Sequence, residues 1–194
     1  INLMCDLGTK GRRLYQEVSD QFVADLEEGQ ITASNALSRL LRLQQITSGY
    51  GRLEDGTDVE IDSSKARVLE DTLTDIGAEP VVVFTRFVHD LDVVHRVAAK
   101  VGVPSYEVSG RRKDLSEWRG GVLAVQIQAG GLGLDLTRAR YAIYYSLGSS
   151  IGDGRRDSDG SVSTSGGRRR SYIKGGQEGM IKTEETLSVL VAKY

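Results

Sequence analysis

A glycine-rich segment in the second half of the chain has the residue types that nucleotide sites use. Residues 129–136 are Ala-Gly-Gly-Leu-Gly-Leu-Asp-Leu. Glycine lets the backbone approach a ligand closely, and the Asp135 carboxylate could accept hydrogen bonds from a ribose or orient a neighbouring group. The segment fails as a dinucleotide fingerprint, because the third glycine of that motif would fall at Leu136. No stretch matches Gly-x4-Gly-Lys-Ser/Thr, so the chain has no phosphate-binding loop and cannot hold ATP by that route alone.

Hydroxyl, amide, glycine and arginine residues also follow three short apolar runs. They occur at residues 85–86 (Thr-Arg), 109–112 (Ser-Gly-Arg-Arg) and 126–131 (Gln-Ile-Gln-Ala-Gly-Gly). Ligands of open parallel sheets bind beyond the carboxyl ends of the strands, so these residues could gather at one edge and hold phosphates. Ordinary turn chemistry explains the same residues, since a strand must end in something polar. Spacing alone leaves both interpretations open.

Other kinds of site have weaker support. Cys5 is the only cysteine, and His89 and His95 belong to one predicted helix but to different faces of it. A disulfide framework and a structural zinc site are therefore excluded, and we expect no metal site. The histidines are interpreted as surface or helix-end residues. The arginine run at 168–170 would ordinarily be a solvated charge cluster.

Length and composition place these groups in an ordinary globular domain. The chain has 194 residues, of which 39% are hydrophobic and 27% charged, with a formal net charge of -2. No apolar run approaches the roughly 20 residues that a membrane span needs, so we expect no membrane insertion. A DNA contact would need a local basic patch. The chain begins at Ile1 without a signal segment, and we expect it to be a fragment that starts within a longer protein.

Hydrophobic periodicity predicts the elements that would position the candidate residues. The first helix, for example, repeats apolar residues every four positions at Leu14, Val18, Phe22 and Leu26. The pattern predicts helices over 10–28, 32–49, 63–77, 91–101, 113–118 and 183–193, strands over 81–84, 106–109, 122–127 and 141–145, a polar loop over 51–62, and loop or disorder over 148–179. Strands that alternate with helices predict an α/β fold with a parallel sheet.

The order of these segments resembles a known family. PVVVFTRFVH (80–89), SGRR (109–112) and VQIQAGGLGLDLTRARYAIYY (125–145) resemble the C-terminal RecA-like lobe of superfamily-two helicases. The similarity is to the Swi/Snf type of double-stranded DNA translocase, and in particular to its compact phage and bacterial members. The resemblance implies a helical segment over 1–62 that joins a missing first lobe, and a RecA-like lobe over 63–194.

In that family two lobes clamp ATP and Mg²⁺ between them and track along one strand of duplex DNA. The first lobe carries the phosphate loop and an acidic pair, which this chain lacks. The resemblance therefore implies ATP and Mg²⁺ only in the complete two-lobe protein, double-stranded DNA and the first lobe as partners, and a cytoplasmic location. It assigns DNA-backbone contacts to Thr85, Arg86, Gly110, Arg111, Arg112, Gln128 and Gly130, and places Gly131, Gly133 and Asp135 near the nucleotide.

One motif of the family is missing. Its Arg-x-His-Arg-x-Gly-Gln segment supplies arginines to the γ-phosphate, and the best register here has Ser161 and Thr164 in their places. Arg168, Arg169 and Arg170 are the nearest alternative cations.

The alternative hypothesis is a non-catalytic RecA-like module that binds DNA or protein. The failed fingerprint disfavours a nucleotide-binding oxidoreductase. By itself, the chain is expected not to hydrolyse ATP.

Overall fold

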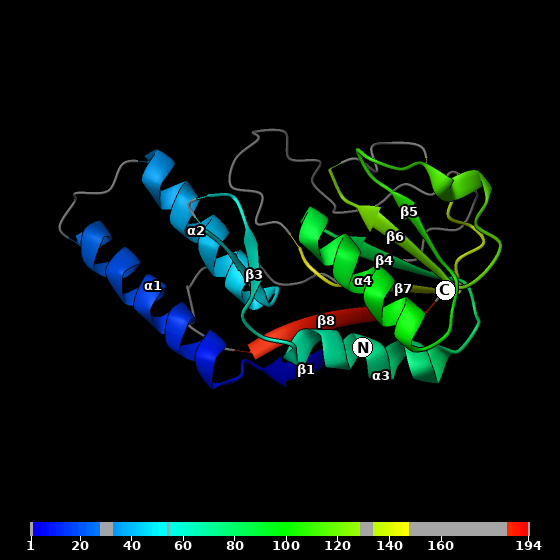
Figure 1. Ribbon diagram of the computed structural model, residues 1–194, viewed down its shortest axis with the longest axis horizontal. Helices are drawn as coiled ribbons and strands as arrows, with labels where there is room; N and C mark the ends of the chain where they lie inside the picture. The colour runs from blue at the N-terminus through cyan, green and yellow to red at the C-terminus, as the bar shows by residue number, and fades with distance from the viewer. Residues whose placement is uncertain (1, 28–32, 54, 129–133, 148–185, 194) are drawn as a thin grey trace.

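The structure, a computed structural model, describes residues 2–27, 33–53, 55–128, 134–147 and 186–193 (Figure 1). Helical and strand elements alternate between residues 58 and 126. In chain order they are β1 (Asn2–Asp6), α1 (Thr9–Glu27), α2 (Ala33–Thr47), β2 (Tyr50–Arg52), β3 (Asp58–Glu60), α3 (Ser64–Ile76), β4 (Val81–Thr85), α4 (Val88–Lys100), β5 (Ser105–Val108), a 3-10 helix (Asp114–Ser116), β6 (Val122–Gln126), β7 (Tyr141–Tyr144) and β8 (Thr186–Lys193).

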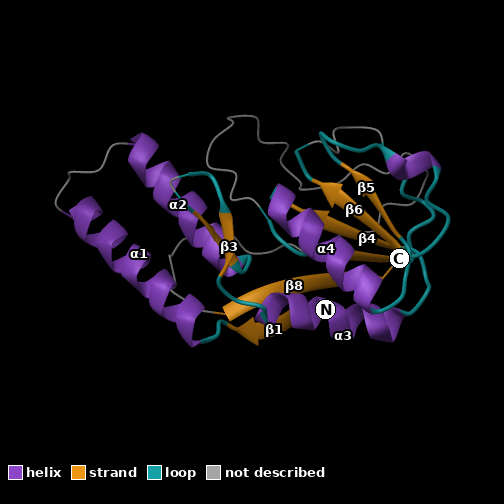
Figure 2. Ribbon diagram, in the orientation of Figure 1, coloured by secondary structure: helices purple, strands orange, loops and turns teal. Residues whose placement is uncertain are grey.

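Six of the strands form one sheet in the order β1-β8-β7-β4-β6-β5. The four strands β7, β4, β6 and β5 are parallel, and β8 and β1 extend the sheet in antiparallel fashion. The predicted α/β class with a parallel sheet is confirmed. Helix α4 crosses in front of the parallel strands in Figure 2. This arrangement follows from crossover connections, which place a helix against the sheet between successive parallel strands.

The parallel strands are buried on both faces, as their continuous apolar runs predict. Val81 and Val83 of β4 pack with α3 and α4, whereas Val82 packs on the opposite face with Trp118. Alternate residues of β6 divide between the two faces in the same way. Because both faces of the central strands are covered, polar groups accessible to a ligand lie at the strand ends.

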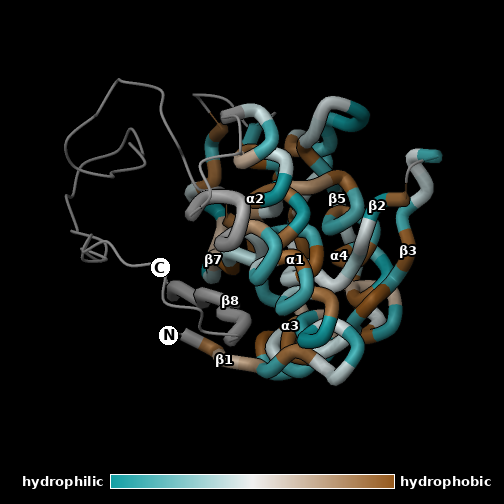
Figure 3. Tube along the Cα trace, turned by 90° about the vertical axis from the view of Figure 1, so that its left-hand side faces the viewer, coloured by the Kyte–Doolittle hydropathy of each residue, from teal (hydrophilic) through white to brown (hydrophobic). Residues whose placement is uncertain are grey.

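Helices α1 and α2 lie beside each other at one end of the molecule (Figure 1). Hydrophilic and hydrophobic segments alternate along them in Figure 3, as expected for helices with one apolar face. Phe22 of α1 and Leu43 and Ile46 of α2 are buried. The predicted helices over 10–28, 32–49 and 63–77 are thus confirmed within a residue or two of their ends. In the described residues, no helix is both long and apolar enough for a membrane span.

The predicted C-terminal helix over 183–193 is wrong. Thr186–Lys193 is strand β8, which pairs with β7 and with β1. Leu187, Val189 and Val191 alternate with their neighbours at the period of a strand, but Leu190 beside them gave the segment the apolar density of a helix. Strand β1, within the segment expected to be helical, was not predicted and joins the sheet only through β8.

Two shorter predictions also need correction. The polar loop expected over 51–62 contains a hairpin of β2 and β3, which pairs Tyr50 with Glu60 and Arg52 with Asp58. Gly56 takes a φ of 84° in its turn, a conformation that favours glycine. Three-residue strands with mostly polar side chains give too little alternation to detect. The helix expected over 113–118 is reduced to the 3-10 turn Asp114–Ser116.

Candidate functional site

The candidate site is the edge where the four parallel strands end. Thr85 at the end of β4 lies beside Gln126 of β6, and Phe84 lies beside Tyr144 of β7. Residues 109–112 follow β5, whose Val108 pairs with Val125. The structure therefore places residues 85–86, 109–112 and the described part of the third group, 126–128, at one edge of the sheet. These strand ends point toward the side of the molecule on which α2 and β3 lie (Figure 1).

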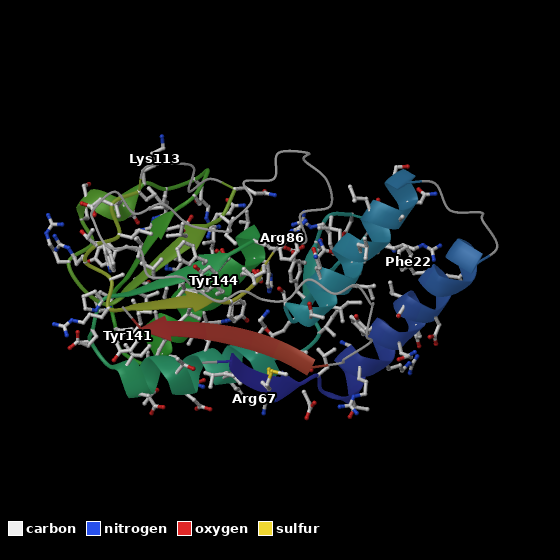
Figure 4. The ribbon with its side chains drawn as sticks, turned by 180° about the vertical axis from the view of Figure 1, so that it is seen from behind. Phe22, Arg67, Arg86, Lys113, Tyr141 and Tyr144 are labelled. Carbon is white, nitrogen blue, oxygen red and sulfur yellow. The ribbon has the colours of Figure 1, made fainter. Side chains whose placement is uncertain are left out.

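Arg86 is the least engaged cation of this edge. Its backbone N–H donates to Ser146 Oγ at 2.8 Å, which joins the ends of β4 and β7. Its guanidinium lies 5.5 Å from the centre of the Phe87 ring and forms no ion pair with any described residue. Figure 4 shows Arg86 between the sheet and α2. A half-exposed arginine without a carboxylate partner is able to take an anionic ligand such as a phosphate.

Arg111, by contrast, is held by the protein itself. Its Nε donates to Glu107 Oε1 at 2.8 Å, and its Nη2 donates to Glu107 Oε2 at 3.1 Å and to Asp92 Oδ1 at 2.5 Å. Glu107 is 0% exposed and also accepts from Ser109 Oγ, while His95 Nε2 lies 2.9 Å from its Oε2. Burial alone raises the pKa of Glu107, but the hydrogen bonds from Arg111, Ser109 and His95 outweigh burial and lower that pKa to about 2.

Arg112 and Gly110 belong to the same turn, but of the two only Arg112 has a side-chain partner among the described residues. Arg112 pairs with Asp114 at 2.5 Å and is exposed. Gly110 is exposed, and a Cβ added there would meet nothing within 4 Å. Neither a positive φ nor packing requires glycine at this position. A close approach by a ligand to the backbone is one reason for glycine that is compatible with this geometry.

The remaining candidate residues, assigned to DNA, to the nucleotide or to the missing arginine motif, are only partly described. Gly130, Gly131, Gly133, Ser161, Thr164 and Arg168 to Arg170 lie outside the described residues. Gln128 is exposed in the turn that follows β6. Asp135 accepts hydrogen bonds from the Thr137 hydroxyl at 2.6 Å and from the Thr137 N–H at 3.1 Å, and these bonds lower its pKa. Its carboxylate closes a local turn.

A buried polar cluster beside this edge was missed by the sequence analysis. We call Ser48, Lys65, Asp90 and Ser146 the Asp90 cluster; all four are buried. Ser146 Oγ donates to Asp90 Oδ2, and Ser48 Oγ donates to the same oxygen at 3.4 Å. Burial raises the pKa of Asp90 to about 6, although the Ser146 hydrogen bond and the Lys65 charge lower it. The cluster joins the end of α2 to α3, α4 and the segment after β7.

A signal for this cluster does exist in the sequence. Asp90 lies three, four and seven residues before Val93, Val94 and Val97, so a carboxylate occupies the apolar face of a predicted helix. Lys65 stands four residues before the buried Leu69 in the same way. A charged residue on an apolar face is rarely buried unless it is paired. The pairing partners, however, come from distant segments that periodicity does not locate.

The two histidines lie in different surroundings, as expected, but neither is simply at the surface. His89 stacks on the Tyr50 ring with centroids 4.1 Å apart, and His95 Nδ1 lies 2.8 Å from Ser105 Oγ. Both rings are half-buried. Within the part of the chain that the structure describes, no group of three or more His, Cys, Asp or Glu residues could hold a metal ion.

Comparisons with known sequences give one relative and no family assignment. No family model matches the chain. Protein p41 of Acyrthosiphon pisum secondary endosymbiont phage 1 is 27% identical over 117 residues, which cover 60% of this chain and 25% of that protein. The chain thus matches only a quarter of the length of p41.

Comparison with solved structures identifies the fold. The chain is similar to the Sulfolobus solfataricus SWI2/SNF2 ATPase core in complex with dsDNA, with a TM-score of 0.54 and 22% sequence identity. The match covers 73% of this chain and 33% of the ATPase core. The chain has a helicase-like RecA fold, as the resemblance of its strand-end motifs implied.

Proposed function

We propose that this chain is the C-terminal motor lobe of an ATP-dependent DNA helicase or translocase of the Swi/Snf type, similar to phage and bacterial members. In this proposal it supplies contacts to the DNA backbone and one side of an ATP cleft. Three findings support it: the RecA-like fold, the gathering of polar groups at one strand edge, and the likeness to an ATPase core whose structure contains duplex DNA. The observation that carries the DNA contact is Arg86 at that edge, which forms no ion pair with any described residue.

The contacts to DNA would be made with phosphates. The Arg86 guanidinium forms no ion pair with any described residue, Gly110 leaves space beside its backbone, and Gln128 is exposed beyond the neighbouring strand end. Cations and backbone amides bind phosphates without regard to base sequence. Arg111 and Arg112 contribute less, because each is neutralised by a carboxylate of its own chain.

The described residues by themselves do not fit ATP and Mg²⁺. Asp135 is engaged by Thr137, and the sequence contains no phosphate-binding loop. ATP and Mg²⁺ therefore enter the proposal only with a first lobe, and we expect the purified chain alone to show no DNA-stimulated ATP hydrolysis. Detectable DNA-stimulated hydrolysis by the chain alone would contradict this expectation.

The direct test of the DNA contact is fluorescence anisotropy of a labelled duplex at several salt concentrations. The unaltered chain should bind weakly, without sequence preference, and with an affinity that falls steeply as salt rises. Arg86→Ala should lower the affinity and reduce the slope of log K against log salt by about 1. Arg67→Ala is the matched control, because Arg67 is an exposed arginine of α3 far from Arg86 (Figure 4).

Two results would overturn the DNA contact. One is binding that does not depend on salt. The other is an unchanged affinity after Arg86, Arg111 and Arg112 have all been changed to alanine.

A non-catalytic binding module is the second candidate, favoured by Ser161 and Thr164 at the positions expected for arginines. It predicts DNA binding without DNA-stimulated ATP hydrolysis even in the complete protein with its first lobe, which a turnover assay would measure.

A further inference from the structure

The Asp90 cluster is connected to the DNA-contact edge by a chain of two hydrogen bonds. Ser146 Oγ accepts the backbone N–H of Arg86 at 2.8 Å and donates its own proton to Asp90 Oδ2. A hydroxyl that donates to a carboxylate is fixed in orientation, so its lone pair stays directed at the Arg86 N–H. Asp90 thus sets the geometry of Arg86 although the two side chains need not touch.

The same carboxylate oxygen also receives Ser48 Oγ from the end of α2 at 3.4 Å. Ser48 and Ser146 are 42 and 56 residues away from Asp90 in the sequence. One buried oxygen therefore joins the end of the α1–α2 helix pair to the strand-end segment that carries Arg86. A displacement of α2 would act on Arg86 through this oxygen.

The cluster is not arranged for maximal stability. Among the described residues, Asp90 Oδ1 and Thr85 Oγ1 are buried without a hydrogen-bond partner. Lys65 is buried over the Tyr145 ring, 4.8 Å from its centroid. Buried polar atoms without partners are costly, and well-packed apolar residues commonly replace buried charges without loss of stability. Stability alone therefore does not account for charged residues at these positions.

We propose that Asp90 is a positioning residue, which holds Arg86 in place for the DNA phosphate through Ser146 and couples that contact to α2 through Ser48. The part of this inference that concerns DNA rests on the proposed function. The hydrogen-bond relay itself does not depend on it.

The charge of Asp90 makes the relay sensitive to pH. The titratable groups that face Asp90 are Lys65 of α3, Tyr50 of β2 and Tyr145, which follows β7. Burial raises the pKa values of both tyrosines above their usual range, so neither titrates near neutrality. The pKa of Asp90 is raised to about 6, so the carboxylate that accepts the Ser146 proton is lost as the pH falls through 6.

Amide hydrogen exchange of the full chain, measured by NMR, tests the relay without DNA. Ser146→Ala removes the acceptor of the Arg86 N–H, and exchange at Arg86 should become about tenfold faster, the effect of losing one hydrogen bond. In the unaltered chain, exchange at Arg86 corrected for its intrinsic rate should accelerate below pH 6, and Asp90→Asn should abolish that pH dependence. The control is Ser116→Ala, an exposed serine of the 3-10 helix that should change neither quantity.

A double-mutant cycle tests the link to DNA. If Asp90 acts through Arg86, Asp90→Asn should weaken duplex binding several-fold in the unaltered background and have no further effect when Arg86 is already alanine. Additive effects, or an unchanged affinity in Asp90→Asn, would show that Asp90 is merely structural. Unchanged exchange at Arg86 in Ser146→Ala would overturn the relay.

These outcomes separate the inference from the proposed function. If the unaltered chain does not bind DNA, the proposed function fails, and exchange at Arg86 still decides whether the relay exists. If Ser146→Ala does not fold, exchange at Arg86 in Asp90→Asn at pH 8 gives the answer, and a rate equal to that of the unaltered chain overturns the relay.

Discussion

Two buried carboxylates lie at the same edge of the sheet, and their surroundings shift their pKa values in opposite directions. Glu107 accepts hydrogen bonds from Arg111 and Ser109 and lies next to His95, and its pKa is lowered to about 2. Asp90 accepts two serine hydroxyls, leaves one oxygen without a partner among the described residues, and has its pKa raised to about 6.

The difference shows that burial does not by itself decide whether a carboxylate is ionised. Both side chains belong to residues that are 0% exposed. Glu107 faces a guanidinium that donates to both of its oxygens, whereas Asp90 faces Lys65 without a hydrogen bond between them among the described residues. Donors that point at the charged form stabilise it, and desolvation opposes it. The Glu107 group is a structural clamp, and the Asp90 cluster is available for positioning.

The largest effect expected from this comparison is the loss of the Glu107 clamp. Glu107→Ala leaves Arg111, His95 and Ser109 without their shared acceptor, and the free energy of unfolding should fall by about 3 kcal/mol. Urea denaturation followed by circular dichroism measures it. Glu117→Ala, an exposed glutamate nearby, should stay within about 0.5 kcal/mol of the unaltered chain. Equal losses in both variants would refute the clamp.

The two carboxylates should also give stability profiles of opposite slope in acid. The pKa of Glu107 is lowered from 4.5 to about 2, so its contribution is present above pH 4.5 and is lost as the pH falls toward 2. The pKa of Asp90 is raised from 3.8 to about 6, so the folded state binds its proton more tightly than the unfolded state does, and stability from this group rises as the pH falls from 6 to 3.8.

Each of these pH contributions is at most about 3 kcal/mol, because one pKa unit corresponds to about 1.4 kcal/mol. Denaturation curves measured at several pH values between about 2 and 8 give the dependence of stability on pH. Glu107→Gln should remove the fall below pH 4.5, and Asp90→Asn should remove the rise below pH 6. If either substitution leaves its part of the pH profile unchanged, the opposite pKa shifts of the two carboxylates are refuted.

A smaller effect is expected when both buried charges of the Asp90 cluster are removed together. Lys65→Met with Asp90→Asn eliminates two desolvated charges at once, and stability at neutral pH should change by no more than about 1 kcal/mol in either direction. Lys65→Met alone should be more harmful, since it leaves the buried Asp90 carboxylate without the positive charge that opposes its desolvation. A double variant less stable than either single variant would contradict this view of the cluster.

The smallest effect distinguishes the two neighbouring arginines. Arg112→Ala removes one exposed ion pair with Asp114 and should change the free energy of unfolding by less than about 1 kcal/mol. Arg111→Ala, which removes the main partner of Glu107, should cost more. Thermal unfolding of the two variants side by side measures the difference, and an equal shift in both midpoints would remove the distinction.

Local pattern was sufficient for much of this fold. The apolar run at 81–84 and the helical stripe that follows it predicted β4 and α4, because burial on two faces and burial on one face leave different periods in a sequence. The polar residues after each strand predicted one edge for Thr85, Arg86 and Gln128, since parallel strands end on the same side. Their phosphate chemistry remains a prediction.

Only the tertiary structure decided how those residues are used. Arg86 and Arg111 look equivalent in the sequence, but Glu107 and Asp92 neutralise Arg111, whereas no described carboxylate pairs with Arg86. Strand β8 needed β7 and β1 beside it to become a strand, since its hydrogen bonds are made with distant segments. The contact of Asp90 with Ser146 spans 56 residues. The sequence determined which residues would be buried or polar, but pairing across such separations depends on how the chain packs, which periodicity does not record.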